Sequence, residues 1–381
     1  MTHSLLAFSQ VFPPFVGGSG LWMHRLVNAW PGPVATLCQE HPLSRAEEQQ
    51  GKNRIRRIPF NFPSWAPDTL TSLKSYWTAI RALKRKIRSV NPAVILCGRG
   101  IPEGVVTRWV AGRVPYVNLA HGEEIVACLT SRKLTALLRY SYRGARLIIA
   151  NSGNTRRLAI QAGADPERCV VIPPGVDASA LGQPVAADPS WPIRPGAMVV
   201  ATVGRLEPRK NQVGVIQAVA KLVAQGKDIH YVIAGAGDGR PVVERTIADC
   251  GMQAHVTLLG GVSDRDVRAL YHACDVFAMP SIQYGPSIEG FGIVFLEAAA
   301  AGKPSIAGTA GGSCDAVVHG STGLVVDGTD IEAIASALAT FYDRPGLRKA
   351  YGQAGQERAR QEFDWAIVLR KAHDAITAAI S

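Results

Sequence analysis

The chain has 381 residues, of which 47% are hydrophobic and 19% are charged. This length is too great for one ordinary core and predicts two globular domains of roughly 180 residues each. The composition excludes an intrinsically disordered chain. The sequence contains no run of about 18 uninterrupted apolar residues, so we predict no membrane-spanning helix. The seven cysteines form no Cys-x-x-Cys pair and lie mostly in apolar runs, so we predict neither a disulfide framework nor a zinc site.

The positive charge belongs to the first half of the chain. The formal net charge is +11; residues 1–180 carry 23 Lys and Arg against 10 Asp and Glu, whereas residues 181–381 carry 18 against 20. This excess predicts an anionic partner, either an acceptor molecule or an anionic membrane surface. No aromatic-interleaved basic motif of a nucleic-acid-binding fold is present, so nucleic acid is not an expected partner. The N-terminus lacks the pattern of a signal peptide, and we expect a cytoplasmic protein, with association at the inner face of the membrane as a hypothesis.

Strand-like apolar runs alternate with helix-like segments along the whole chain. This order predicts an α/β protein built from two doubly wound parallel sheets. The predicted strands of the first half are Ser4–Phe8, Val34–Cys38, Ala93–Cys97, Tyr116–Ala120, Arg146–Ala150 and Cys169–Ile172. Those of the second half are Met198–Gly204, His230–Ala234, His255–Leu259, Val276–Met279, Ser305–Ala307 and Leu324–Val326. The stretch from Pro173 to Gly196 has little periodicity and is interpreted as an interdomain linker, which gives domains of residues 1–180 and 190–364.

The first predicted strand leads into a glycine-rich loop. Its sequence from residue 12 to residue 20 is Phe-Pro-Pro-Phe-Val-Gly-Gly-Ser-Gly, and a helix is expected from about Leu21. A glycine-rich loop after the first strand of a doubly wound sheet is a place where a phosphate can approach the backbone. Gly17 and Gly18 are therefore candidate ligand contacts. The alternative is a flexible turn.

A basic amphipathic helix is predicted from about Thr69 to Arg88. Its apolar residues recur at helical spacing, and Lys84, Arg85, Lys86 and Arg88 gather at its C-terminal end. Such a helix is typical of proteins that rest on an anionic membrane surface. The alternative is an ordinary half-buried surface helix whose cations lie favourably at the negative end of the helix dipole.

A histidine follows the predicted strand Tyr116–Ala120, in the sequence His121-Gly122-Glu123-Glu124. A lone histidine at the end of a strand is usually structural. However, ligands of open α/β folds bind at the carboxyl edge of the sheet, and this position makes His121 a candidate for catalysis.

Two cations stand in the loop that follows the first strand of the second domain. Arg205 offers a planar fork to phosphate oxygens and Lys210 offers a point charge, so together they can offset the charge of a diphosphate. The alternative is a pair of solvated surface cations. The turn Gly235-Ala236-Gly237-Asp238-Gly239 has its third glycine misplaced for a dinucleotide fingerprint and is weak evidence for one.

Two carboxylates enclose a glycine turn near residue 290. Glu289 precedes Gly290-Phe291-Gly292, the apolar run from Ile293 predicts a helix, and Glu297 lies about two helical turns beyond Glu289. The free N–H groups of such a helix end suit an oxygen-rich or anionic ligand. The alternative is a capping Glu289 and a solvated Glu297.

The whole stretch from Glu289 to Gly312 closely resembles a known signature. Its Glu-x7-Glu spacing, with the following Gly-Lys-Pro-Ser-Ile-Ala-Gly-Thr-Ala-Gly-Gly, is similar to retaining glycosyltransferases of the two-domain GT-B fold. The resemblance is greatest to the family, glycosyltransferase family 4, that contains sucrose-phosphate synthases and bacterial phosphatidylinositol mannosyltransferases. It implies two Rossmann-like domains facing across a cleft, with the final helix, residues 365–381, crossing back to the N-terminal domain.

The resemblance also implies a role for each candidate residue. Donor contacts would come from Gly17 and Gly18 for the diphosphate, Val262 of the Gly260–Ser263 loop for the nucleobase, Glu297 for the ribose, and Glu289 with the N–H groups of Gly290, Phe291, Gly292 and Ile293 for the sugar. Arg205 and Lys210 would hold the leaving diphosphate, and His121 would lie beside the transferred sugar. These four residues, His121, Arg205, Lys210 and Glu289, are the predicted catalytic set.

The predicted reaction is the transfer of a hexose from a nucleotide sugar to a hydroxyl of a lipid-linked or other glycan or anionic acceptor. GDP-mannose is the favoured donor, and a UDP-sugar is the alternative donor. No Asp-x-Asp motif is present, and neither a metal nor another cofactor is expected. Two alternatives stay open: a nucleotide-sugar epimerase of the same fold, and a dinucleotide-dependent oxidoreductase supported only by the doubly wound domains and their glycine-rich turns.

Overall fold

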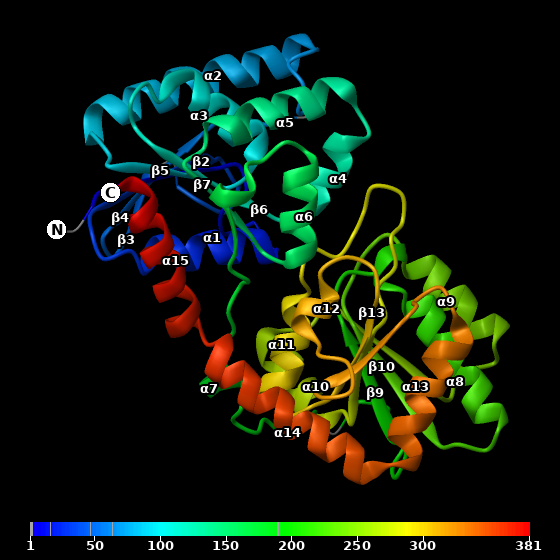
Figure 1. Cartoon of the computed structure of the whole chain (residues 1–381). Helices are drawn as coiled ribbons and strands as arrows, with labels where there is room; N and C mark the ends of the chain where they lie inside the picture. The colour runs from blue at the N-terminus through cyan, green and yellow to red at the C-terminus, as the bar shows by residue number, and fades with distance from the viewer. Residues whose placement is uncertain (1–2, 16, 46, 63, 189) are drawn as a thin grey trace. The chain divides into compact units, whose positions relative to one another are not determined.

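The computed structural model describes residues 3–15, 17–45, 47–62, 64–188 and 190–381 (Figure 1). The chain forms two compact units. Unit 1 extends to Pro174 and also includes Val368–Ser381, and unit 2 comprises Gly175–Ile367. Among the described helices, none combines the length and the apolar character that crossing a bilayer requires.

Unit 1 is built on an eight-stranded sheet with the order β3-β4-β2-β1-β5-β6-β7-β8. All neighbouring strands are parallel except β3 and β4, which form an antiparallel pair. The strands are β1 (Leu5–Ser9), β2 (Val34–Gln39), β3 (Glu47–Gln50), β4 (Asn53–Ile58), β5 (Val94–Cys97), β6 (Tyr116–Ala120), β7 (Leu147–Ala150) and β8 (Cys169–Val171). Apart from β4, the parallel strands are mostly apolar and buried, as a sheet covered on both faces requires.

Helices cover both faces of this sheet. In Figure 1, α2, α3 and α5 lie together on one face and α1 lies on the other. The helices are α1 (Gly18–Asn28), α2 (Leu70–Val90), α3 (Val105–Val110), α4 (Glu123–Leu129), α5 (Arg132–Gly144) and α6 (Gly153–Gln161). The last part of α15 (Trp365–Ile380) also belongs to unit 1, where the ring of His373 packs 5.1 Å from that of Trp30. The prediction that the final helix returns to the N-terminal domain is confirmed.

Unit 2 is a second parallel sheet, with the order β11-β10-β9-β12-β13-β14. Its strands are β9 (Met198–Val203), β10 (Ile229–Ala234), β11 (Val256–Gly260), β12 (Val276–Met279), β13 (Ser305–Gly308) and β14 (Gly323–Val326). Its helices are α7 (Ala178–Leu181), α8 (Gln212–Ala224), α9 (Arg240–Asp249), α10 (Asp264–Ala273), α11 (Ile293–Ala300), α12 (Ser313–Ala316), α13 (Ile331–Asp343) and α14 (Pro345–Glu362). One apolar core joins the sheet to α8, α9 and α13, and another joins it to α10, α11 and α14.

All twelve strands predicted from the sequence are present, within two residues of the expected bounds. Three details differ. Helix α1 begins at Gly18, three residues before Leu21, because the glycine-rich loop itself supplies the first turn. The linker contains a short helix, α7, which Asp177 caps by accepting a hydrogen bond from the N–H of Ala180. The boundary between the units falls after Pro174, ahead of the predicted end of the first domain at residue 180.

The antiparallel pair β3–β4 was not predicted. Its sequence is mostly polar, and only Ile55 and Ile58 of β4 contribute large apolar side chains to the buried side. Arg54, Arg56 and Arg57 belong to β4, the strand next to the edge strand β3. Arg57 is buried there, 3.1 Å from Glu48 of β3, and donates to the carbonyl of Pro13 in the glycine-rich loop.

Candidate active site

A buried ion pair joins two of the predicted catalytic residues in unit 2. The Glu289 carboxylate accepts hydrogen bonds from Nζ of Lys210 and from Nη1 of Arg209, the latter at 2.8 Å. Glu289 is 7% exposed, and burial alone would raise its pKa, but the charges of Lys210 and Arg209 outweigh burial and lower it. Glu289 is therefore ionised at neutral pH, held by two cations.

A short turn positions Lys210. The turn Pro208–Lys210 follows β9, and Asn211 then takes a left-handed φ of 59°, a conformation that Asn tolerates better than most residues. The Asn211 side chain caps α8 by accepting from the N–H of Gly214, and it donates to the carbonyls of Pro280 and Gly328. Asn211 thus fixes the end of the Lys210 turn against the loop after β12.

Arg205 lies in a different environment from Lys210. Its side chain is 67% exposed and its Nη1 lies 2.6 Å from Oε1 of Glu207. The other carboxylate oxygen of Glu207 lies 3.1 Å from Nε of Arg209. Arg205 is thus linked to Glu289 through Glu207 and Arg209, and makes no direct contact with Glu289 in the described structure. The sequence analysis missed Arg209 as a site residue, although its place beside Lys210 was a signal.

The glycine turn after Glu289 ends at the start of α11. Gly292 has a φ of 85°, and a Cβ on it would come 2.7 Å from the Phe295 ring, so only glycine fits without strain. No side chain caps α11, whose first residue is Ile293. Of the two residues between Glu289 and Gly292, Phe291 is buried and Gly290 is half-buried. The loop thus brings a helix N-terminus without a side-chain cap next to the ionised Glu289.

Glu297 lies about one turn into α11. Its Oε2 accepts a hydrogen bond of 2.7 Å from the hydroxyl of Tyr271 on α10. Burial raises the pKa of Glu297, and the Tyr271 hydrogen bond opposes this rise. Tyr271 was not predicted as a site residue, because nothing in the sequence links α10 to α11. The remaining candidate of unit 2, Val262, lies in the loop between β11 and α10 and is half-buried beside the apolar cluster that contains Leu270.

His121 follows β6 at the carboxyl edge of the unit 1 sheet, and three loops hold it. Its Nε2 lies 2.9 Å from the carbonyl oxygen of Gly98, its N–H donates to Glu124, and its carbonyl accepts from Asn151. The Trp22 ring packs edge-on at 5.6 Å. Burial lowers the pKa of His121, so the imidazole is neutral at neutral pH.

The two glycines of the first loop are exposed at the start of α1. Gly17 is the N-cap residue of this helix and makes no side-chain cap, and Gly18 is its first residue. A Cβ on Gly18 would meet no described atom within 4 Å. Packing within the chain therefore does not explain a glycine at this position, whereas close approach of a ligand to the backbone would.

A buried acid that the sequence analysis missed lies in the loop after β5. Glu103 has no exposed surface, and its Oε1 accepts from the backbone N–H of Gln10 at the end of β1. Its Oε2 has no hydrogen-bond partner among the described residues. Burial raises the pKa of Glu103. Glu103 thus ties the end of β1, which leads to the glycine-rich loop, to the loop that precedes α3.

We expect the variant Glu103→Gln to be more stable than the wild type at neutral pH. The pKa of Glu103 in the folded state lies above its unfolded value of about 4.3. The free energy of unfolding of the wild type therefore falls as pH rises from the unfolded pKa to the folded pKa, by about 1.4 kcal/mol for each unit between the two. The amide keeps the acceptor for Gln10 and carries no charge. Urea denaturation at pH 7 and at pH 4 measures this difference, which should disappear at pH 4. Glu40→Gln, at an exposed position, is the control; a variant no more stable than this control at pH 7 would contradict the expectation.

Comparison with known proteins agrees with this geometry. Residues 16–180 match the family model described as Glycosyltransferase Family 4, and residues 186–358 match that of Glycosyl transferases group 1. A GDP-mannose-dependent monoacylated alpha-(1-6)-phosphatidylinositol monomannoside mannosyltransferase of Corynebacterium glutamicum is 31% identical over 96% of each chain. The chain belongs to glycosyltransferase family 4. A GDP-mannose-dependent alpha-(1-6)-phosphatidylinositol monomannoside mannosyltransferase of Mycolicibacterium smegmatis is 34% identical over 67% of this family 4 chain and 68% of its own.

Solved structures match the fold of this family 4 glycosyltransferase. Sucrose-phosphate synthase of Thermosynechococcus elongatus has a TM-score of 0.82 at 20% identity, covering 99% of this chain and 98% of its own. The Anabaena HepE protein in complex with UDP has a TM-score of 0.78 at 21% identity, covering 98% and 100%. The prediction of a GT-B fold with two Rossmann-like sheets, and of a glycosyltransferase from the Glu289–Gly312 resemblance, is confirmed.

Proposed function

We propose that this glycosyltransferase transfers mannose from GDP-mannose, with retention of the anomeric configuration, to a hydroxyl of a lipid-linked acceptor. The observation that carries the proposal is the buried pairing of Lys210 with Glu289 beside the uncapped N-terminus of α11. The choice of donor and acceptor rests on the Corynebacterium and Mycolicibacterium relatives, whose names specify GDP-mannose and phosphatidylinositol mannosides. UDP-glucose and UDP-N-acetylglucosamine are the competing donors.

In this proposal the donor is held mainly by unit 2. Lys210 and Arg205 bind the diphosphate, and Glu289 binds sugar hydroxyls together with the N–H groups of Gly290 to Ile293. Glu297 binds the ribose hydroxyls, and the backbone at Val262 meets the base. Glu297 is suited to this role because its carboxylate accepts a hydrogen bond from Tyr271 at one oxygen, Oε2. Gly17 and Gly18 of unit 1 add backbone contacts to the diphosphate.

The transfer step breaks the bond between the anomeric carbon and the phosphate oxygen, and the electron pair leaves with the diphosphate. The acceptor oxygen attacks from the same face and forms the new bond, and its proton passes to the departing phosphate. Lys210 and Arg205 offset the negative charge that develops, and the N-terminus of α11 contributes its dipole, so no metal is needed. His121, neutral because its pKa is lowered, orients the sugar and stabilises the developing positive charge through its carbonyl or its ring.

A panel of sugar nucleotides, assayed with a phosphatidylinositol mannoside acceptor in the presence and absence of EDTA, tests this function. We expect GDP-mannose to be the preferred donor, EDTA to leave turnover unchanged, and NMR to assign the α-anomer to the product. A β-linked product would overturn the retaining mechanism, and preference for a UDP-sugar would overturn the donor. Formation of an epimerised sugar without transfer to any acceptor would favour the epimerase-like alternative, and binding of NAD with hydride transfer would favour the oxidoreductase.

We further propose that unit 1 contacts an anionic membrane through α2. One exposed stripe of this helix carries Leu70, Leu73 and Trp77 in its first half and cations in its second half, at spacings of three or four residues. The cations of the stripe are Arg81, Lys84, Arg85 and Arg88. The side chains of Leu73 and Trp77 are 49% and 58% exposed. Apolar residues beside cations suit the boundary between acyl chains and anionic headgroups.

The double variant Lys84→Glu with Arg85→Glu should bind phosphatidylglycerol vesicles more than tenfold more weakly than the wild type, because each cation near an anionic surface contributes about 1 kcal/mol. Vesicle sedimentation at low salt measures this binding. Arg245→Glu with Lys349→Glu, at exposed positions of unit 2, makes the same change of net charge and should bind as the wild type does. Equal weakening in both variants would assign the binding to net charge and not to α2.

A further inference from the structure

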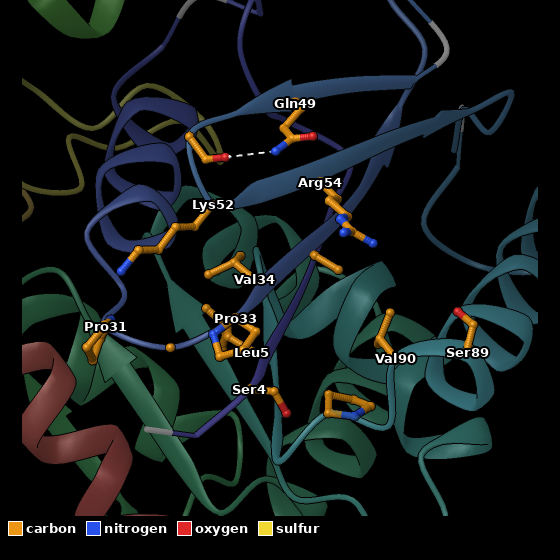
Figure 2. A pocket seen from close by; sticks show the side chains of 14 residues that line it. Ser4, Leu5, Pro31, Pro33, Val34, Gln49, Lys52, Arg54, Ser89 and Val90 are labelled. Carbon is orange, nitrogen blue, oxygen red and sulfur yellow. Dashed lines mark hydrogen bonds between the residues drawn. The ribbon is translucent and has the colours of Figure 1, made fainter. Parts of the chain in front are cut away.

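A cavity of about 740 Å³ lies at the edge of the unit 1 sheet that is opposite to His121. Its lining includes Ser4 and Leu5 at the start of β1, Val34 at the start of β2, and Pro92 just before β5. These residues mark the amino ends of parallel strands, whereas His121 follows the carboxyl end of β6. The turn of the β3–β4 hairpin and the C-terminal end of α2 complete the wall (Figure 2). The cavity is thus separate from the candidate active-site residues of the same unit.

Two cations of this wall, Lys52 and Arg54, have no counter-ion among the described residues. The hairpin compensates its other two arginines, because Arg56 faces Glu47 and Arg57 faces Glu48. The residue opposite Arg54 is the neutral Gln49, and Lys52 stands in the turn itself. Within the described part of the chain, neither Lys52 nor Arg54 takes part in an ion pair.

The two cations bracket the cavity. In Figure 2, Lys52 extends towards Pro31, and Arg54 lies on the side of Ser89 and Val90. The walls combine apolar prolines and valines with the hydroxyls of Ser4 and Ser89 and the amide of Gln49. A concave site of this size, lined by both apolar and polar groups, can hold a small molecule.

The positive charge continues beyond the cavity. A second hollow of about 420 Å³ also has Ser89 in its lining and is otherwise bounded by cations of α2. Burial, the largest cause, lowers the pKa of Lys86 on the same helix, and the charges of Arg56 and Arg54 lower it further. The charge of Glu47 opposes this lowering only in part. The region therefore holds more positive charge than its own carboxylates neutralise, a condition that a bound anion would relieve.

We propose that this cavity binds a phosphate monoester, with Lys52 and Arg54 as its charged contacts, at a site distinct from that of the sugar donor. A monoester carries close to two negative charges at neutral pH, which matches two unpaired cations. The guanidinium of Arg54 offers a planar fork to two phosphate oxygens, and Lys52 offers a mobile point charge. The apolar and hydroxyl-bearing walls suit the organic part of the ester. The same phosphate chemistry occurs in a free metabolite and in a membrane lipid with a terminal phosphate.

Isothermal titration calorimetry with glycerol 3-phosphate, in the presence of saturating GDP, tests the site. We expect saturable binding by the wild type and a loss of at least about tenfold in affinity in Lys52→Gln with Arg54→Gln, because hydrogen bonds to charged groups are the strong ones. Arg245→Gln with Lys349→Gln removes one Arg and one Lys elsewhere and should bind as the wild type does. Both pairs are exposed, so circular dichroism and the unfolding transition should be unchanged in each variant.

A second arm distinguishes the two sources of the phosphate. If glycerol 3-phosphate binds and the Lys52/Arg54 variant loses it, the ligand is a soluble ester. If it does not bind, but vesicles containing phosphatidic acid lose more than tenfold affinity in this variant and not in the control, the ligand is a lipid headgroup. Absence of both effects, or equal losses in the control, overturns the proposal. This proposal rests on the proposed function only in keeping GDP at the donor site. A separate titration of the protein with GDP alone reports failure of the donor assignment, so the two failures are distinguishable.

Discussion

Replacing Lys210 by alanine should lower kcat by about 100-fold to 1000-fold, the cost of removing one group that stabilises charge developing in a transition state. Lys210 is largely buried, and its Nζ contacts Glu289, so its charge acts at short range in a site of low dielectric constant. The fold should survive, because Glu289 keeps Arg209 as a counter-ion. Steady-state kinetics with the preferred sugar nucleotide measure the loss.

Two further variants sharpen this test. Arg205→Ala should also lower turnover. The Arg205 side chain is exposed and must break its ion pair with Glu207 before it can contact a ligand. Lys221→Ala removes a lysine from an exposed ion pair with Glu332 in the same unit and should leave turnover unchanged. Near-normal turnover of both Arg205→Ala and Lys210→Ala would remove these two residues from the leaving-group role.

Replacing Glu289 by alanine should destabilise unit 2 by about 3–5 kcal/mol, because it leaves the buried charge of Lys210 without its carboxylate and leaves Arg209 with Glu207 alone. The pKa of Glu289 is lowered in the folded state, so its contribution to stability is present above the unfolded pKa of about 4.3 and is lost as pH falls through the folded pKa. The difference between variant and wild type should therefore be full at pH 7 and shrink in acid. Guanidinium denaturation followed across this pH range measures it.

Glu332→Ala is the matched control for this stability experiment. It also removes one carboxylate from an ion pair of unit 2, but the side chains of Lys221 and Glu332 are 40% and 67% exposed. Exposed pairs contribute about 0–1 kcal/mol. If Glu289→Ala cost no more than Glu332→Ala, the description of Glu289 as a buried, doubly paired carboxylate would be wrong.

The regular part of the fold could be predicted from the sequence because its strands are parallel and buried on both faces. Continuous apolar runs such as Val94–Cys97 or Val276–Met279 then stand out against the helical segments between them. The pair β3–β4 escaped prediction for the converse reason. It lies at the edge of the sheet, where Glu47 to Gln50 need bury no apolar face and therefore show no apolar pattern.

The candidate site could be predicted as separate motifs but not as a network. The sequence indicated Lys210 and Glu289 individually, yet their contact joins residues 79 positions apart and depends on the turns at Asn211 and Gly292. Arg209 was missed because a cation in a loop is usually solvated, and only the folded chain buries it against Glu289. Tyr271 was missed because its bond to Glu297 depends on how α10 packs beside α11.

The polar edge strand β3 has a consequence for how the molecule behaves at high concentration. An unpaired strand at the end of a sheet offers its free N–H and C=O groups to any other extended chain, and long apolar edges of this kind promote aggregation. Here the last strand is four residues long, antiparallel to its neighbour, and carries two glutamates and two glutamines. A second chain that added a strand at this edge would have to desolvate those carboxylates, so the hairpin ends the sheet and opposes its growth from one molecule into the next.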